Sequence, residues 1–194
     1  MNYSIECVVA ANNHLGEGPV WDVREQALYW VDGTGARVGN PTIWRLDPAS
    51  GTTKHWTLGR DIGAMALREN GGAVLALDDG LYFFDFDSEA LELIHHIEQE
   101  QPRSRLNDGK VDRRGRFVAG GMDDKEELGI CGLWRLDPDL SIHKIDDGII
   151  CSNGPCWSPD DKTFYFADTF QQLMWSYDYD LESGEVSNKQ SFAS

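Results

Sequence analysis

Short runs rich in aromatic and β-branched residues recur along the chain, separated by turn-forming residues. The clearest run is Thr163–Ala167, which follows the turn-forming stretch Ser158–Lys162. Pro presets one backbone angle in such a turn, and Asp caps the turn through its side chain. No stretch shows the apolar period of about 3.6 residues that marks an amphipathic helix. Short strands with turns between them predict an all-β fold.

The predicted strands fall into groups of four that repeat along the chain. Each group begins its first strand beside one of four residues, spaced by 46, 44 and 46 positions: Glu17, Gly63, Asn107 and Asn153. A repeat of roughly 40–50 residues with four strands is typical of a β-propeller blade. We therefore predict a single partial propeller domain over residues 1–194, with blades at roughly 15–60, 61–104, 105–149 and 150–194. A β-sandwich is the alternative, but it would not require this period.

Residues 1–14 are the one segment that precedes the first predicted blade. Within them, Ile5–Ala10 is apolar enough to predict an opening strand, one that could close the ring beside a later blade.

The first strand of each propeller blade lines the central channel, so the four repeated positions should converge on one axis. Arg105 lies two positions before Asn107, so both side chains project to the same face of an extended strand. Two alternatives assign these residues no functional role: Glu17 is then an exposed loop acid, and Asn107–Gly109 is then a simple turn.

The predicted axial cluster combines Glu17 and Asn153 with the flanking Arg105 and Asn107. Carboxylate and amide oxygens are hard ligands that suit Ca²⁺, Mg²⁺ or Mn²⁺. Such a cation polarises a carbonyl and lowers the pKa of bound water, while Arg and Asn can bind hydroxyls or a developing oxyanion. The cluster predicts metal-assisted hydrolysis of a small polar ester or lactone by activated water. No residue of the chain is a convincing general base.

Composition and charge narrow the possible partners. The formal net charge is −16, from 33 acidic and 17 basic residues. This charge disfavours nucleic acid and anionic membrane surfaces, which bind basic patches. The chain begins without a signal segment, and no apolar run approaches the ~20 residues that span a bilayer.

The four cysteines lack the short paired spacing of a zinc site or a disulfide framework: Cys7, Cys131, Cys151 and Cys156. Cys156 alternates with Trp157 in a predicted inner strand, and we expect it to be a thiol packed in the core. Together with the missing signal segment, this cysteine usage predicts a cytoplasmic, reduced protein.

Three ordered motifs resemble those of the SMP-30/gluconolactonase/regucalcin-like (LRE) family. They lie at residues 15–21, 105–122 and 152–169, and the resemblance continues through residues 177–188. It covers essentially the whole chain. The resemblance implies a six-bladed propeller that opens sugar lactones to aldonic acids with one axial divalent cation, Ca²⁺, Zn²⁺, Mn²⁺ or Mg²⁺.

The resemblance also implies roles for single residues. Glu17 and Asn153 match metal ligands of the family, and Arg105 and Asn107 match substrate-binding positions. A further substrate-contacting Glu falls in the loop that contains Glu126 and Glu127, and we take Glu126 for this role.

The family's third metal ligand, an Asp that also acts as the catalytic base, follows a stretch similar to Ser187–Lys189, and in this chain it would lie beyond Ser194. We therefore expect about four of the six blades, and a catalytic base outside this sequence. Two alternatives to a lactonase stay open: a calcium-binding regulatory propeller without turnover, and an inactive fragment. The residues leave open which sugar lactone is the substrate.

Overall fold

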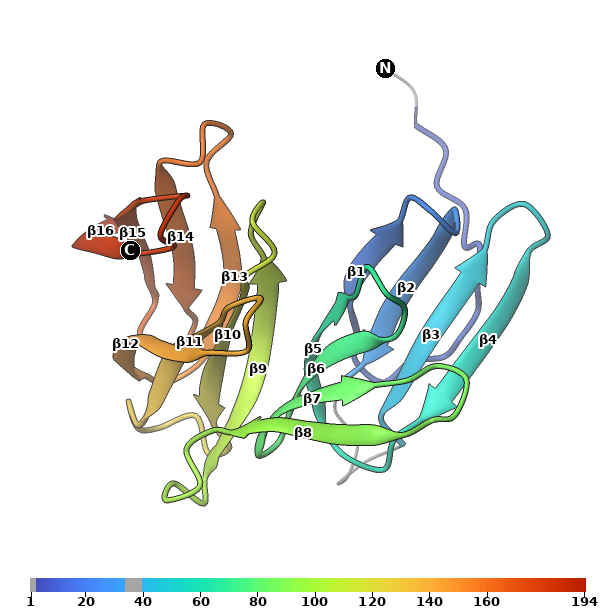
Figure 1. Ribbon diagram of the computed structural model, residues 1–194, viewed down its shortest axis with the longest axis horizontal. Helices are drawn as coiled ribbons and strands as arrows, with labels where there is room; N and C mark the ends of the chain where they lie inside the picture. Colours follow the sequence, from blue (N-terminus) through green and yellow to red (C-terminus); the bar gives the residue numbers. More distant parts are fainter. Residues whose placement is uncertain (1–2, 34–39) are drawn as a thin grey trace.

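Antiparallel β-sheet makes up the regular structure of the computed structural model, which describes residues 3–33 and 40–194 (Figure 1). Within these ranges sixteen strands form four four-stranded sheets, and no helix occurs. The first two sheets contain β1 (Gly16–Asp22), β2 (Ala27–Asp32), β3 (Thr42–Asp47) and β4 (Thr52–Thr57), then β5 (Ile62–Leu67), β6 (Ala73–Leu77), β7 (Gly80–Phe84) and β8 (Leu91–His96). The other two contain β9 (Ser104–Val111), β10 (Phe117–Asp123), β11 (Cys131–Leu136) and β12 (Ile142–Ile149), then β13 (Ser152–Trp157), β14 (Thr163–Asp168), β15 (Leu173–Tyr179) and β16 (Val186–Ala193).

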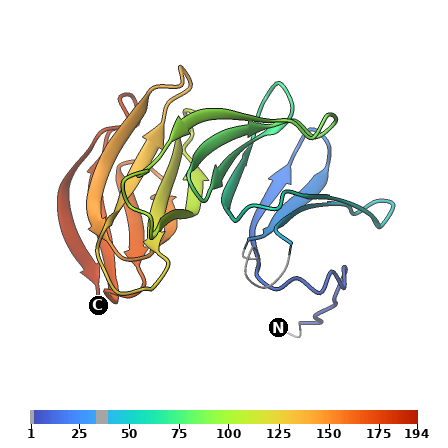
Figure 2. The same ribbon diagram turned by 90° about the horizontal axis from the view of Figure 1, so that it is seen from below.

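Each sheet is a meander in which every strand pairs with its neighbour in sequence. The first strand of each sheet packs against the first strand of the next, so that β1, β5, β9 and β13 form the inner row. The four sheets follow one another in an arc around this row (Figure 2). This arrangement confirms the predicted all-β propeller architecture.

The apolar positions of the strands form a separate core between each pair of neighbouring sheets. One cluster joins the first and second sheets, another the second and third, and another the third and fourth. In β2, for example, Ala27, Tyr29 and Val31 alternate with less buried positions and face the second sheet. The outermost strands β4, β8 and β16 are mostly exposed. Burial on the faces of each blade therefore sets the stacking of the blades.

The inner strands share one irregularity, which lies at the repeated positions. The pairing register breaks after Glu17 in β1, at Gly63 in β5, at Asn107 in β9 and after Asn153 in β13. A β-bulge bends a strand and redirects its side chains, and bulges are frequent beside active sites. The repeat therefore places four bulges at the same level of the inner row.

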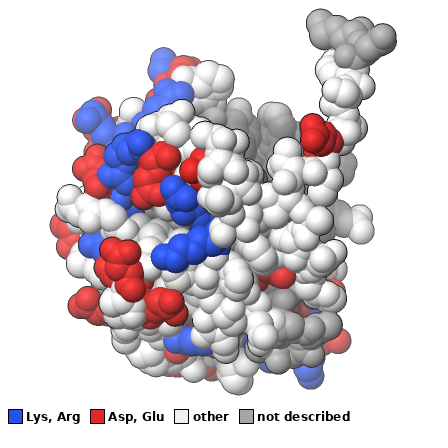
Figure 3. Space-filling model, turned by 90° about the vertical axis from the view of Figure 1, so that its right-hand side faces the viewer, with Lys and Arg blue, Asp and Glu red and all other residues white. Residues whose placement is uncertain are grey.

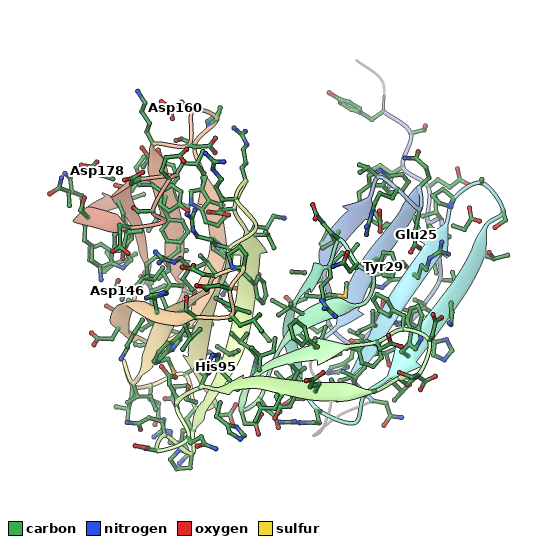
Figure 4. All side chains as sticks on the ribbon, viewed as in Figure 1. Glu25, Tyr29, His95, Asp146, Asp160 and Asp178 are labelled. Atoms are coloured by element: carbon green, nitrogen blue, oxygen red, sulfur yellow. The ribbon has the colours of Figure 1, made fainter. Side chains whose placement is uncertain are left out.

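Many of the acidic residues serve the turns. Asp160, at the tip of the β13–β14 turn (Figure 4), accepts a hydrogen bond of 2.6 Å from Ser158 Oγ. On the face shown in Figure 3, acidic and basic side chains lie next to one another on the left of the view, and much of the rest of the face carries neither.

Two expectations from the sequence are wrong. Ile5–Ala10 forms no strand, and Ile5 is 98% exposed, because no sheet edge within the described ranges pairs with this segment. Cys156 is exposed, because its position in β13 lines the axial cavity instead of a core between sheets. The four cysteines are free thiols, as expected.

None of the described residues belongs to a helix that is long and apolar enough to cross a bilayer.

Candidate functional site at the propeller axis

Two asparagines from neighbouring blades touch at the axis. Asn107 Nδ2, from β9, donates to Asn153 Oδ1 at 3.2 Å and to the Ser152 carbonyl oxygen at 2.9 Å, both in β13. Asn153 Nδ2 in turn donates to Thr169 Oγ1 at 2.8 Å. Since the amide nitrogen of Asn153 is bonded to Thr169, its oxygen is directed toward Asn107. The structure therefore brings together two predicted site residues that lie 46 positions apart.

Arg105 joins this pair. Its Nη1 donates to Asn107 Oδ1 at 3.2 Å and to the Leu106 carbonyl oxygen at 3.1 Å. Its Nε lies 3.4 Å from Asp124 Oδ1, in the loop that follows β10. The guanidinium is therefore held beside the asparagine pair by contacts on both sides.

Glu17 approaches the same region from β1, on the first sheet. Its carboxyl is half-buried, and a Cβ at Gly33 would lie 2.9 Å from its Oε1. Burial raises the pKa of Glu17, the negative charge of Asp108 raises it further, and Arg105 lowers it. Both Asp108 and Arg105 belong to β9, so Glu17 on the first sheet interacts electrostatically with two charged residues of the third sheet.

A cavity of about 830 Å³ runs along the inner strands. Glu17, Asp108 and Gly154 all line it, and they come from the first, third and fourth sheets. Within the described residues no hydrogen bond joins Glu17 to Asn153. Their binding of a common cation stays a prediction.

Glu126 lies in the loop between β10 and β11, exposed and with a φ of 62°. The buried Asp123 organises this loop, since its carboxylate accepts the backbone N–H groups of Glu127 at 3.0 Å and Leu128 at 2.9 Å. Burial raises the pKa of the Cys151 thiol, Asp168 and Glu126 add to this effect, and Arg105 opposes it. No hydrogen bond or ion pair among the described residues joins the Glu126 side chain to the axial cluster, and its contact with substrate stays a prediction.

Three residues that contact the cluster were missed by the sequence reasoning. Thr169 and Asp124 hold Asn153 and Arg105, and Cys151 Sγ lies 3.4 Å from Asn153 Nδ2 and 3.6 Å from Asn107 Nδ2. None of these contacts has a signal in the strand pattern, because each partner belongs to a loop or to a different strand from the residue it holds.

The donor atoms at the axis fit a hard divalent cation. The carboxylate of Glu17 and the amide oxygen of Asn153 are both oxygen ligands of the kind that Ca²⁺, Mg²⁺ and Mn²⁺ prefer. The carboxylates of Glu17 and Asp108 line the same cavity and repel one another, and a cation there would relieve the repulsion. Over residues 3–33 and 40–194, no three His, Cys, Asp or Glu side chains gather into a cation site of their own.

Comparison with known proteins supports the same family as the motifs. The profile of the SMP-30/Gluconolactonase/LRE-like region matches residues 15–194. Regucalcin of Xenopus laevis is 35% identical over 190 residues, which cover 95% of this chain and 62% of the relative. The 6-deoxy-6-sulfogluconolactonase of Pseudomonas putida is 35% identical over 190 residues, which cover 98% of this chain and 63% of the relative. The chain thus spans less than two thirds of the length of these relatives.

Among solved structures, the regucalcin of Agrobacterium tumefaciens, described as a calcium-binding protein, superposes with a TM-score of 0.83 at 27% identity. The match covers 92% of this chain and 59% of that protein. Because the family profile matches nearly the whole chain, this protein belongs to the SMP-30/gluconolactonase/LRE-like family.

Proposed function

We propose that the protein hydrolyses a sugar lactone with the help of one divalent cation held at the propeller axis. The observation that carries the proposal is the joined group of Arg105, Asn107 and Asn153, whose chain neighbours Asp108 and Gly154 line the same cavity as Glu17. Membership of a family that includes a sulfogluconolactonase supports the reaction class.

Glu17 and Asn153 would hold the cation through their side-chain oxygens. A divalent cation bound there would polarise the lactone carbonyl and lower the pKa of a water molecule. Arg105 is a permanent cation with several N–H donors, so it can bind the ring or carbonyl oxygens of a lactone. Asn107 fixes the amide of Asn153 and, with Arg105, would orient the substrate.

Glu126 would accept a hydrogen bond from a sugar hydroxyl. Its loop is held by Asp123, which also accepts a hydrogen bond of 2.7 Å from Arg103 Nε. A fixed loop reduces the entropy lost when substrate binds.

The single-domain organisation, the blade limits and the cytoplasmic location also stay predictions.

The test is hydrolysis of a panel of gluconate, xylonate, arabinonate and galactonate lactones, by protein expressed from its complete reading frame. We expect EDTA to stop turnover, and added Ca²⁺, Mn²⁺, Mg²⁺ or Zn²⁺ to restore it. Turnover that EDTA does not reduce would contradict the proposed metal dependence.

A pair of variants locates the cation. Glu17→Gln removes the axial carboxylate and should abolish cation binding in a calorimetric titration. Glu25→Gln is the matched control, since Glu25 lies in the β1–β2 turn and accepts hydrogen bonds from Tyr29 and Arg45 away from the cavity. Equal cation affinity in the two variants would show that Glu17 does not bind the cation.

A calcium-binding propeller without turnover is the second candidate, favoured by the structural similarity to a regucalcin described as calcium-binding. It predicts tight Ca²⁺ binding that depends on Glu17, with no hydrolysis of any lactone in the panel. The titration and the lactone assay together separate the two candidates.

A further inference from the structure

The sequence leaves a simple turn at Asn107–Gly109 as an alternative, but in the structure Asp108 lies within β9, directly after Asn107. It is half-buried, and it lines the axial cavity together with Glu17 and Gly154.

The carboxylate of Asp108 connects two blades. Its Oδ1 accepts a hydrogen bond of 2.7 Å from the N–H of Gly109, in its own strand. Its Oδ2 accepts one of 2.7 Å from the N–H of Gly154, in β13 of the fourth sheet. Hydrogen bonds to an ionised acceptor are about twice as strong as those between neutral groups.

The second bond lies at the bulge of β13. The pairing of β13 with β14 breaks between Asn153 and Cys156, and Gly154 has a φ of 63°. A left-handed residue of this kind suits glycine and sets the direction of the chain around it. Asp108 therefore fixes the peptide that follows Asn153, at the point where the strand leaves its regular geometry.

Both the side chain and the backbone of Asn153 are therefore fixed by hydrogen bonds. Its side chain is bonded to Asn107 and Thr169, and its backbone is followed at once by the peptide that Asp108 binds. A metal-ligating side chain whose amide oxygen is already held in place loses less entropy when a cation binds.

Asp108 also shares a cavity with Glu17. The two carboxylates line it from the third and the first sheet. A cation in this cavity would be attracted by both.

We propose that Asp108 is a positioning residue of the axial cation site: it fixes the bulge that carries Asn153 and adds a second negative charge opposite Glu17. The inference rests on the proposed function, because it assumes a divalent cation between Glu17 and Asn153. Asp108 itself acts through Gly154 and through its charge.

The test compares Asp108→Asn with the wild type in calorimetric titrations with Mn²⁺ and Ca²⁺. Asparagine keeps one oxygen that can accept the Gly154 N–H but removes the charge. Loss of a residue that orients metal ligands typically weakens binding by about 10- to 100-fold, and we expect at least about tenfold here.

Asp161→Asn is the matched control. Asp161 also links the third and fourth blades, through an ion pair of 2.5 Å with Arg113, but it lies in the β13–β14 turn. Its variant should bind the cation as the wild type does. Asp108→Glu is the second variant: it keeps the charge but displaces the oxygen from Gly154, so its affinity should fall between those of the wild type and D108N.

Thermal unfolding separates positioning from simple stabilisation. At a fixed cation concentration, a bound cation raises the melting temperature by an amount that grows with the logarithm of its affinity. A merely structural Asp108 would lower the melting temperature equally with and without cation, whereas the proposed role reduces the increment that the cation produces.

The outcomes are distinct for the two proposals. Wild-type cation affinity in D108N or in D108E overturns the role of Asp108, even when Glu17→Gln abolishes binding. Failure of the wild type to bind Mn²⁺ or Ca²⁺, or unchanged binding in Glu17→Gln, overturns the proposed function itself.

Discussion

Replacing Asp112 with Ala should destabilise the contact between the third and fourth blades, which carry Asn107 and Asn153. The Asp112 side chain is 1% exposed, and its Oδ2 accepts hydrogen bonds from Arg116 Nη1 at 2.9 Å and from Tyr179 Oη at 2.5 Å. Tyr179 belongs to β15, so the carboxylate joins the two sheets.

The magnitude follows from what the substitution leaves behind. Arg116 is 10% exposed, and without Asp112 its nearest carboxylate would be that of Asp137, whose Oδ1 lies 3.8 Å from Arg116 Nε. Removing one partner of a buried ion pair costs about 3–5 kcal/mol. Arg116 keeps the Leu181 carbonyl oxygen as an acceptor at 2.8 Å, so we expect the lower end, about 3 kcal/mol. For a chain of this size that corresponds to a decrease in melting temperature of about 6–12 °C.

Urea unfolding followed by tryptophan fluorescence measures the change in the free energy of unfolding. Asp161→Asn is the control, because its partner Arg113 is 64% exposed, such surface pairs contribute about 0–1 kcal/mol, and asparagine tolerates the φ of 56° at this position. The double variant Asp112→Ala/Arg116→Met should be more stable than Asp112→Ala alone, since it buries no unpaired charge. Equal decreases in the free energy of unfolding in the Asp112 and Asp161 variants would refute the reasoning.

Three further predictions concern packing, pH and substrate. Gly63→Ala should destabilise the protein by about 1–3 kcal/mol in the same unfolding assay, because a Cβ there would overlap the carbonyl oxygen of Leu106; an unchanged midpoint would contradict this close approach. Burial raises the pKa of Asp112, but hydrogen bonds from Tyr179 and Arg116 outweigh it and lower the pKa. The stability that Asp112 contributes should therefore be fully present above its unfolded pKa of about 3.9 and be lost as the pH falls through its lower folded value, so the difference between the wild type and Asp112→Asn should shrink in acid. A difference that stays constant down to low pH would contradict this assignment. Glu126→Gln should raise KM for the lactone more than it lowers kcat, because a rim contact is made equally in ground and transition states; equal changes in kcat and kcat/KM would place Glu126 in the chemistry instead.

The strand pattern identified most of the architecture from local information. Aromatic and β-branched runs such as Thr163–Ala167 coincide with observed strands, and the spacing of Glu17, Gly63, Asn107 and Asn153 placed all four at equivalent bulges of the inner strands. This succeeded because the two-residue alternation of a strand and the length of a blade are both properties of neighbouring residues.

Local pattern failed where a residue's neighbours come from other blades. Cys156 reads as a core thiol beside Trp157, yet it lines the cavity. Ile5 reads as part of a strand, yet a strand forms only where another strand accepts its hydrogen bonds.

The sequence by itself determined the all-β repeat, the family and the four equivalent positions of the inner strands. Only the tertiary structure decided that Asn107 donates to Asn153, that Asp108 binds the peptide after Asn153, and that Asp124 holds Arg105. The physical reason is that strand formation depends on residues close in sequence, whereas side-chain partners at the axis are set by the bulges and by how neighbouring blades pack.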